Sequence, residues 1–411
     1  MRKNTQNLRL KPVEMNVDLD EVVRLGAKQM IAAALESEIN AYLDKFTQAD
    51  ADRISQDIVR NGYHRERDIA VGAGMVTVSV PRTRNQRGDS ENFVSQLVPP
   101  YMRRSVTINE AVPLLYLRGL SNGDMMPALE KLFGKGIRGL SPANVTRLKS
   151  VWKKEYEDWR HRDLSGKRYV YVWVDGIHLQ VNMGDSNLCT LVMIGALADG
   201  KKELIAVEGG YRESEESWAT TLRGLRQRGF QAPNLFIGDG ALGFWKAAKS
   251  VFPTAKCQRC WVHKLRNVLD KLPKSLQRQG KTMLHDIYLA PDKATALKAY
   301  KQFVACFGAK YPKVTECLEK DKAVLFTFFD FPAEHWLHIR TTNVIESTFS
   351  TVRLRTRKTR GKGTAESILL MVYKLLEQAT IRWQRLRGAK LLLKVIRNVQ
   401  FEDGKEMKLA A

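Results

Sequence analysis

The chain has 411 residues, 44% hydrophobic and 27% charged, a balance typical of a globular protein with two or three domains. Lys and Arg total 67 against 44 Asp and Glu, which gives a formal net charge of +23 and a pI of about 9.8. This excess of cations favours a nucleic-acid partner over a ribosome-associated protein, a membrane-surface protein or a merely basic surface. The longest apolar runs, such as 169–174, are too short to cross a bilayer, so no membrane partner is expected.

The five cysteines do not make a disulfide framework in a chain of this length. The opening MRKNTQNLRLKP is basic but no apolar stretch follows it, so we expect no secretory signal. Both observations predict a reduced, intracellular protein.

The first hundred residues (1–100) are expected to form a helical region with a small hairpin. Apolar residues recur at helical spacing over 18–47, which predicts one long amphipathic helix. The alternating segment 75–80, MVTVSV, has basic flanks and predicts a strand of a hairpin.

Residues 101–165 are expected to hold three helices, at 111–118, 121–134 and from Ser141 onward, where Pro142 follows a capping serine. The third helix carries the polar and basic residues Asn144, Arg147 and Lys149. Three short helices with a basic third one fit a helix-turn-helix unit that binds DNA. A helical linker with a solvated charged face fits equally well.

From residue 166 the pattern changes to that of an α/β domain. Strands are predicted at 168–174, 177–183 and 188–198, followed by helix, strand, helix and strand up to residue 260. This is the order of a ribonuclease-H-like sheet. We therefore predict a catalytic core that begins at 166–263, is interrupted by a helical insertion at 264–340, and ends with a helix in 341–366. A basic helical tail, 367–411, follows.

Three carboxylates fall at the ends of these predicted elements: Asp175 after YVYVWV, Asp239 after NLFIG, and Glu346 in TTNVIEST. A ribonuclease-H-like sheet would bring its first strand, its fourth strand and its last helix to one edge. Carboxylate oxygens on rigid elements suit two divalent cations, which stabilise the attacking and leaving oxygens of a phosphodiester displacement. The three acids are therefore the predicted catalytic residues and metal ligands.

Each acid also has a purely structural explanation. Val174 to Ile177 resembles a tight Asp-Gly hairpin. Asp239 precedes a predicted helix as an N-cap would. Asn343 and Glu346 have the spacing of a capping box. Taken one at a time, these explanations are as good as the functional one.

A cationic run follows Glu346 without an acidic residue to interrupt it. If the helix continues, Arg353 lies seven residues beyond Glu346 and faces the same side. Such a run beside a metal site is suited to hold DNA phosphates, although a solvated charged surface is the alternative. Its six cations are Arg353, Arg355, Arg357, Lys358, Arg360 and Lys362.

Four segments together resemble the transposases of bacterial Mutator-type insertion sequences: VDG at 174–176, GDG at 238–240, CQRCWVHK at 257–264 and HWLHIRTTNVIESTFSTVRLRTRKTRG at 335–361. The resemblance covers about 168–362. It implies that Asp175, Asp239 and Glu346 are the acidic triad of a DDE transposase. It also aligns Cys260 and His263 with the family's C-x-x-H motif. Active-site support is further expected from Trp336 and Asn343.

By this resemblance we expect a transposase that binds the terminal inverted repeats of its element and cleaves and joins DNA strands. Two Mg²⁺ ions, or Mn²⁺ in their place, would be its cofactors. Its partners would be double-stranded DNA at the element ends and the target, and a second copy of the chain. A circular intermediate and an address at the bacterial nucleoid are also implied.

The spacing C-x2-C-x2-H of Cys257, Cys260 and His263 also invites a zinc site. Structural zinc needs four ligands, and no second pair follows at a normal spacing, although His285 is a conceivable fourth. The alternatives place His263 near the active edge, where it contacts phosphate or a metal-bound group, or leave it as a packed histidine.

Two other classes of function stay open on the sequence. One is a ribonuclease-H-like nuclease, such as a resolvase, that cuts DNA without joining it. The other is a DNA-binding regulator with no catalytic activity.

Overall fold

The computed structural model describes residues 18–49, 58–85, 92–118, 120, 122–133, 142–180, 187–210, 214–240, 242–359 and 364–407. The chain divides into two compact units, Met1–Arg147 and Leu148–Ala411. No helix in these ranges is long and apolar enough to span a membrane.

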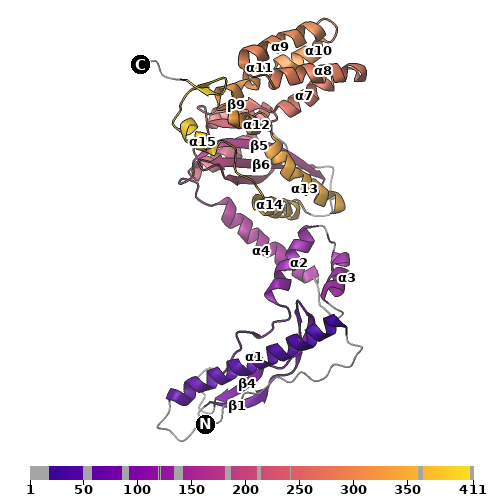
Figure 1. Cartoon of the computed structure of the whole chain (residues 1–411), viewed down its shortest axis with the longest axis vertical. Helices are drawn as coiled ribbons and strands as arrows, with labels where there is room; N and C mark the ends of the chain where they lie inside the picture. The colour runs from indigo at the N-terminus through magenta and orange to yellow at the C-terminus, as the bar shows by residue number, and fades with distance from the viewer. Residues whose placement is uncertain are drawn as a thin grey trace. The chain divides into compact units, whose positions relative to one another are not determined.

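In the first unit a long helix packs on short antiparallel strand pairs (Figure 1). Helix α1 (Leu19–Ala49) confirms the predicted helix, and β3 (Gly74–Val78) confirms the predicted hairpin strand, paired with β2 (Arg67–Val71). A second pair, β1 (Ile58–Tyr63) with β4 (Pro81–Asn85), was not predicted. Leu35 and Ile39 of α1 are buried against the apolar side chains of this region.

Helices α2 (Val106–Leu117) and α3 (Asn122–Phe133) follow, as predicted, and pack against the β2–β3 hairpin. Ile108 and Val112 of α2 meet Met125 and Leu129 of α3 in one apolar cluster. Helix α4 (Pro142–Arg160) also begins where the sequence predicted. Ser141, its expected N-cap, lies outside the described residues.

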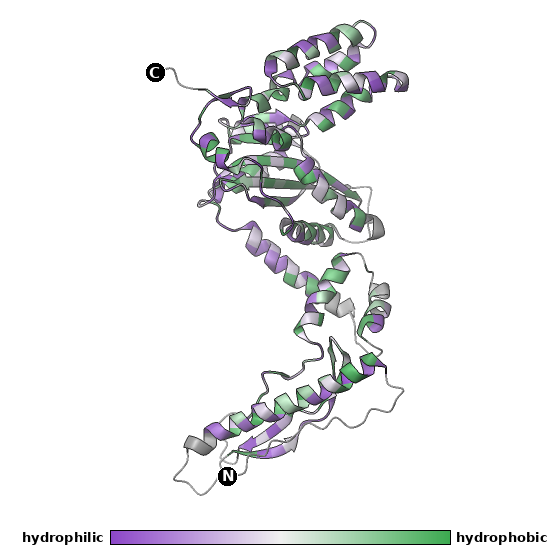
Figure 2. Ribbon diagram, in the orientation of Figure 1, coloured by the Kyte–Doolittle hydropathy of each residue, from purple (hydrophilic) through white to green (hydrophobic). Residues whose placement is uncertain are grey.

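The second unit is built on a five-stranded mixed sheet in the order β7-β6-β5-β8-β9. The middle of the sheet is largely green, hence hydrophobic, in Figure 2. Strands β6 and β7 run antiparallel to their neighbours, whereas β8 and β9 are parallel to β5. The bounds are β5 (Tyr169–Gln180), β6 (Asn187–Leu197), β7 (Lys202–Gly210), β8 (Leu235–Gly238) and β9 (Lys256–Arg259).

The strand prediction was wrong in one respect. The runs 168–174 and 177–183 belong to a single strand, β5, up to residue 180; residues 181–183 are outside the described ranges. The chain does not turn at Asp175 and Gly176, because these residues pair with Val192 and Leu191 of β6. The third strand is instead β7, whose short apolar run between charged residues is typical of a sheet edge.

Helices cover both faces of the sheet, so β5 is apolar on both sides. On one face, α5 (Glu215–Gln227) and α6 (Leu242–Val251) bury Trp218 and Phe244 against Val172 and Val174. On the other, Trp173 donates a hydrogen bond to the carbonyl of His338 at 2.9 Å. Helices α13 (Asn343–Thr359) and α14 (Ala365–Thr380) contact β5 and β7, respectively.

Between β9 and α13 the chain is helical, as predicted for the insertion. Ala296, Tyr300, Phe303 and Phe307 of this region are all buried. The elements are α7 (Trp261–Leu269), α8 (Lys274–Tyr288), α9 (Lys293–Phe307), α10 (Pro312–Glu319), α11 (Lys322–Leu325), η1 (Thr327–Asp330), η2 (Ala333–His335) and α12 (Trp336–Ile339). Helix α15 (Ala389–Ile396) and the strands β10 (Phe401–Glu402) and β11 (Lys405–Glu406) complete the chain.

Candidate active site

Two of the three predicted acids stand next to each other on adjacent parallel strands. Val174 of β5 is paired with Gly238 of β8, and each is followed directly by an aspartate. Neighbouring strands lie about 4.8 Å apart, so this register brings Asp175 and Asp239 side by side. Asp175 is 9% exposed, and its carboxylate accepts a hydrogen bond from the amide of Gly176 at 2.9 Å.

Glu346 reaches the same place from the first turn of α13. All three acids line one pocket of about 260 Å³. The other residues around this pocket are Gly176, His178, His263, Arg266 and Arg353. The structure therefore brings together three carboxylates that are up to 171 positions apart in the sequence, one from each predicted element.

The structural explanations for these acids do not fit the observed elements. Asp175 lies inside a continuous strand and not in a hairpin turn. Helix α6 begins at Leu242, three residues beyond Asp239. Helix α13 begins at Asn343, and the Glu346 carboxylate contacts the side chains of Thr342 and His263.

The hydroxyl of Thr342 contacts three side chains, two of which, His263 and Glu346, line the pocket. Its Oγ1 lies 3.3 Å from the sulfur of Cys260, 3.4 Å from Nδ1 of His263 and 3.2 Å from Oε1 of Glu346. The Thr342 amide also donates to the Cys260 sulfur at 3.3 Å. Since the hydroxyl has one proton, it donates to one of these acceptors at a time.

His263 is the direct neighbour of Glu346, with 3.2 Å between Nε2 and Oε1. Burial lowers the pKa of His263, and the carboxylates of Glu346 and Asp239 partly oppose that shift. Burial also raises the pKa of the Cys260 thiol. His263 therefore faces the active edge, one of the alternatives left open by the sequence.

The C-x2-C-x2-H zinc hypothesis is not supported by the positions of its side chains. In the described ranges, the ligand atoms of Cys260, His263 and Glu346 lie within 4.8 Å of one another. Cys257 is not in this group, and burial raises the pKa of its thiol to about 11. His285 packs against Tyr288 instead.

The cationic run after Glu346 divides into different environments along α13. Arg353 is exposed and lines the pocket, which confirms that it faces the same side as Glu346. Arg355 is only 4% exposed, so the expectation that it binds DNA is not supported. Two residues along a helix correspond to a rotation of about 200°, which turns Arg355 toward the protein interior. Arg357 and Lys358 have no described side chains, and Arg360 and Lys362 lie outside the described ranges.

The two remaining support residues do not line the pocket. Asn343 is exposed at the start of α13. Trp336 is buried among aromatic rings, and its indole N–H donates to the carbonyl of Phe331 at 2.8 Å. Trp336 thus stabilises the end of the insertion.

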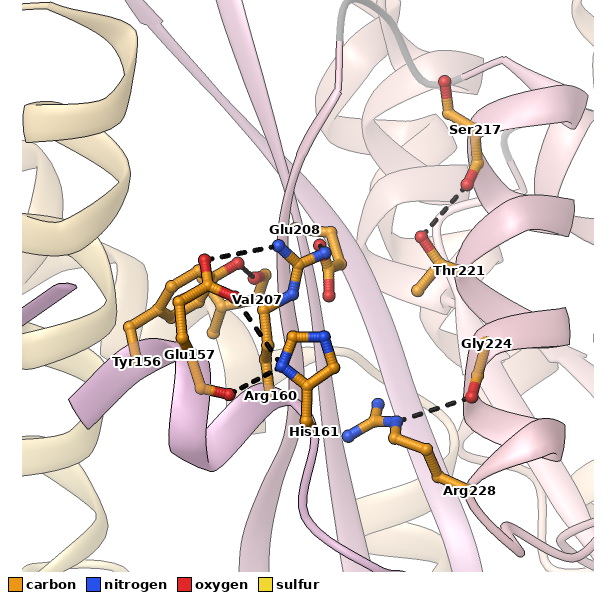
Figure 3. A network of polar contacts seen from close by, with 10 residues as sticks. All are labelled: Tyr156, Glu157, Arg160, His161, Val207, Glu208, Ser217, Thr221, Gly224 and Arg228. Atoms are coloured by element: carbon orange, nitrogen blue, oxygen red, sulfur yellow. Dashed lines mark hydrogen bonds and ion pairs between the residues drawn. The ribbon is translucent and has the colours of Figure 1, made fainter. Parts of the chain in front are cut away.

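Helix α4 is attached to the edge strand β7 through its second half (Figure 3). The Tyr156 hydroxyl donates to the carbonyl of Val207 at 2.8 Å, and Arg160 forms an ion pair with Glu208 at 3.0 Å. Burial raises the pKa of Glu208, and the Arg160 charge opposes this shift.

The residues predicted to bind DNA on α4 differ in their surroundings. Lys149 is half-buried and donates to Ser367 of α14 at 3.3 Å, so its amino group contacts protein and not a free DNA surface. Arg147 is exposed. The Asn144 side chain is not described. The second half of α4 thus matches the linker alternative better than a free recognition helix.

Sequence reasoning did not single out Thr342, Arg266 and His178. Thr342 lies in the TTN-x-IE segment, so its position beside Glu346 was a usable signal. Arg266 comes three residues after His263, on the same face of α7, and a helical-wheel argument would have found it. His178 lies three residues beyond Asp175 in β5. The sequence had predicted a break between two strands there, so His178 was not placed beside Asp175.

The sequence matches the family described as "Transposase, Mutator family" over residues 1–386. It is 51% identical over 298 residues to the transposase of element IS6120 of Mycolicibacterium smegmatis, which covers 72% of this chain and 92% of that one. The transposase of element IST2 of Acidithiobacillus ferrooxidans is 46% identical over 288 residues, covering 68% of this chain and 95% of that one.

Among solved structures, the HTLV-2 integrase catalytic core domain in complex with magnesium (trimeric form) is 15% identical and covers 31% of this chain and 90% of its own. Its TM-score is 0.18, and a value this low supports no inference. The family match spans nearly the whole sequence, and two relatives exceed 45% identity. The chain belongs to the Mutator family of transposases.

Proposed function

We propose that this transposase cleaves and joins DNA strands at the pocket formed by Asp175, Asp239 and Glu346. The observation that carries the proposal is the convergence of three carboxylates from two parallel strands and a distant helix on one pocket. We further propose that the sheet is ribonuclease-H-like and that the enzyme is of the DDE type.

The donor set of the pocket fits hard divalent cations. Carboxylate oxygens are the ligands that Mg²⁺ prefers, with Mn²⁺ as a substitute. Asp175, Asp239 and Glu346 would hold the ions, two in our proposal. Such a pair, when bound, stabilises the attacking and leaving oxygens of an in-line phosphodiester displacement.

The neighbouring side chains prepare the carboxylates and the phosphate for this reaction. Thr342 and His263 contact one oxygen of Glu346, which fixes the orientation of its carboxylate. Arg266 and Arg353 bring two positive charges to the pocket wall. Their guanidinium groups suit the non-bridging oxygens of a DNA phosphate.

The reaction needs no covalent bond between protein and DNA. In the first step, water attacks a phosphodiester at the element end, the bond between phosphorus and O3′ breaks, and a free 3′-hydroxyl is left. In the second step, that hydroxyl attacks a phosphodiester of the target, and a new strand joint forms as a target hydroxyl leaves.

The binding partners in this proposal are the terminal inverted repeats and a target duplex, held by a dimer of the chain. The division into an N-terminal DNA-binding half (1–165), an interrupted catalytic core (166–263 and 341–366), an insertion (264–340) and a basic tail (367–411) belongs to the same proposal. The exposed Arg147 is consistent with it.

Incubation with pre-nicked element ends and a target plasmid tests the reaction. The DNA that flanks the reading frame supplies the ends. We expect joined products that require a divalent cation. Cleavage without any joined product would instead identify a nuclease of the resolvase type.

The second rival, a DNA-binding regulator, predicts that the acids are dispensable. We expect Asp175→Asn, Asp239→Asn and Glu346→Gln each to abolish joining while duplex binding persists. Joining that survives in any one of the three variants removes that residue from the triad.

A further inference from the structure

A wide groove in the N-terminal unit is lined mainly by basic side chains. Its volume is about 1910 Å³, and its walls come from β2, β4, the segment 92–104 and the start of α2. The arginines that line it are Arg65, Arg67, Arg82, Arg84, Arg103, Arg104 and Arg147. The acids that line it are Glu66 and Asp68.

Both acids accept hydrogen bonds from hydroxyl groups, one on β3 and one on the residue that follows it. Thr77 donates to Asp68 at 2.6 Å, and Ser79 donates to Glu66 at 3.2 Å. Neither acid forms an ion pair with a groove arginine in the part of the chain that the structure describes. With seven arginines against two carboxylates, the groove keeps an excess of positive charge.

The arginines have two kinds of role. Arg67 donates to the carbonyls of Val98 and Pro99, and Arg82 donates to the carbonyl of Asn61, so these two stabilise the walls. The other five have no ion pair with any residue that the structure describes. Most of these are exposed: Arg65, Arg84, Arg103 and Arg147, with Arg104 half-buried.

Arg104 shows that cations are crowded at one end of the groove. Burial lowers its pKa, and the positive charge of Arg147 lowers it further. Two guanidinium groups that repel each other are stabilised when an anion lies between them. This end of the groove is thus preorganised for a phosphate.

An unusually exposed aromatic ring lies on the same wall. Tyr101 is 93% exposed and has a φ of 65°, in the left-handed region that non-glycine residues rarely adopt. Packing within the protein does not explain a ring held out in this way. Strained backbone of this kind gathers at ligand-binding sites.

We propose that this groove binds the sugar–phosphate backbone of duplex DNA, as a second DNA contact of the transposase apart from the acidic pocket. The inference rests on the proposed function, which makes DNA the substrate. Guanidinium forks match phosphate oxygens in a way that lysine does not, and seven arginines and no lysine line the groove. The groove is also far larger than a single phosphate or nucleotide requires.

The test compares two triple variants of the full chain that lose the same charge. One removes groove cations, Arg65→Ala, Arg84→Ala and Arg103→Ala. The other removes exposed cations of the same unit outside the groove, Lys28→Ala, Lys45→Ala and Lys131→Ala. Fluorescence anisotropy with a labelled duplex is followed over salt concentration, in EDTA so that strand cleavage does not intervene.

The slope of log K against log salt is negative, and we expect its magnitude to decrease by about 3 in the groove variant. Each lost phosphate contact removes about 0.9 from that magnitude. The matched control should keep the wild-type slope within about one unit. Equal slopes in the two variants would overturn the proposal. Equal affinity of the wild type for DNA and for poly-glutamate would also overturn it, because the groove would then bind any polyanion and not DNA in particular.

Tyr101→Gly provides a measurement that does not depend on charge. Glycine adopts the left-handed backbone freely, so the fold of the loop is kept. We expect weaker binding with an unchanged salt slope, because the ring carries no charge. Affinity equal to wild type would exclude the ring from the DNA contact. Because binding is measured without divalent cations, failure of the catalytic proposal would leave these results interpretable.

Discussion

Arg259 packs directly against Gly240, the residue that follows the proposed metal ligand Asp239. A Cβ atom at position 240 would lie 2.1 Å from Nη1 of Arg259, and the Gly240 backbone has a φ of +82°. Only glycine satisfies both conditions. The turn that presents Asp239 thus depends on a buried guanidinium beneath it.

We therefore predict that Gly240→Ala lowers the free energy of unfolding by about 2–4 kcal/mol, from backbone strain and overpacking together. Strand joining should fall as well, because the Asp239 turn shifts. Urea denaturation measures the first effect. The control is Gly224→Ala in α5, where a Cβ meets nothing within 4 Å. It should be neutral or stabilising by up to about 1 kcal/mol. Equal stability of the two variants would contradict the account.

Asp321 of the insertion pairs with two buried cations, Arg259 at the end of β9 and Lys264 of α7. Its carboxylate lies 3.3 Å from Nε of Arg259 and also pairs with Lys264, whose Nζ donates to the Cys317 carbonyl at 2.6 Å. Asp321→Asn should cost about 3–5 kcal/mol of unfolding free energy, because both cations stay buried without a counter-charge.

A second substitution separates charge from packing at this site. Lys264→Met in the Asp321→Asn background removes one of the unpaired cations, so part of the lost stability should return. Chemical denaturation of the single and double variants measures the difference. A loss below about 1 kcal/mol in Asp321→Asn would show that the buried ion pairs do not stabilise the fold.

Arg353 should contact a DNA phosphate from the pocket wall. Arg353→Ala is expected to reduce the salt slope of duplex binding by about one unit and to slow strand cleavage. Arg226→Ala, an exposed arginine at the end of α5, is the charge-matched control and should leave both unchanged. If the two variants show the same slope, Arg353 does not contact the phosphate.

Acid should destabilise the protein through two histidines near α12. Burial lowers the pKa of His335, whose Nδ1 lies 2.7 Å from the Tyr171 hydroxyl, and lowers that of His338 to about 4. Below pH 6.5 these two histidines therefore bind more protons in the unfolded chain than in the folded protein. Stability is therefore fully present above pH 6.5 and is lost as the pH falls towards 4, by roughly 3 kcal/mol for His338.

His338→Gln tests this pH dependence. The glutamine oxygen can accept from the Arg387 amide, as His338 Nε2 does at 3.3 Å, without titrating. Thermal unfolding between pH 7 and 4 should show a shallower loss of stability in the variant. Identical pH profiles for variant and wild type would exclude His338 as a cause.

The sequence predicted the positions of the acids better than the path of the chain between them. Asp175 and Asp239 follow apolar runs, and parallel strands place such ends at one edge whatever the loops do. The hairpin at Asp175 and Gly176 could not be excluded locally, since the same dipeptide serves a turn or a strand. Pairing with β6, a tertiary contact, decides in favour of the strand.

The α13 cations show a second limit of sequence-based prediction. Arg353 and Arg355 have the same chemistry and lie two residues apart, yet one lines the pocket and the other is buried. The charge pattern does not reveal which face of α13 packs on β5 and β6. The distance of seven residues from Glu346 did reveal it for Arg353, because that spacing returns to the same face of a helix.

The most direct test of the central claim replaces a carboxylate by a thiolate and asks which metal restores activity. Thiolates favour softer cations than Mg²⁺, so Asp175→Cys and Asp239→Cys should lose joining about 100-fold or more in Mg²⁺. Mn²⁺ should restore joining in these variants but not in Asp175→Ala or Asp239→Ala. Full activity of the cysteine variants in Mg²⁺, or of the wild type in EDTA, would contradict a metal site at these acids.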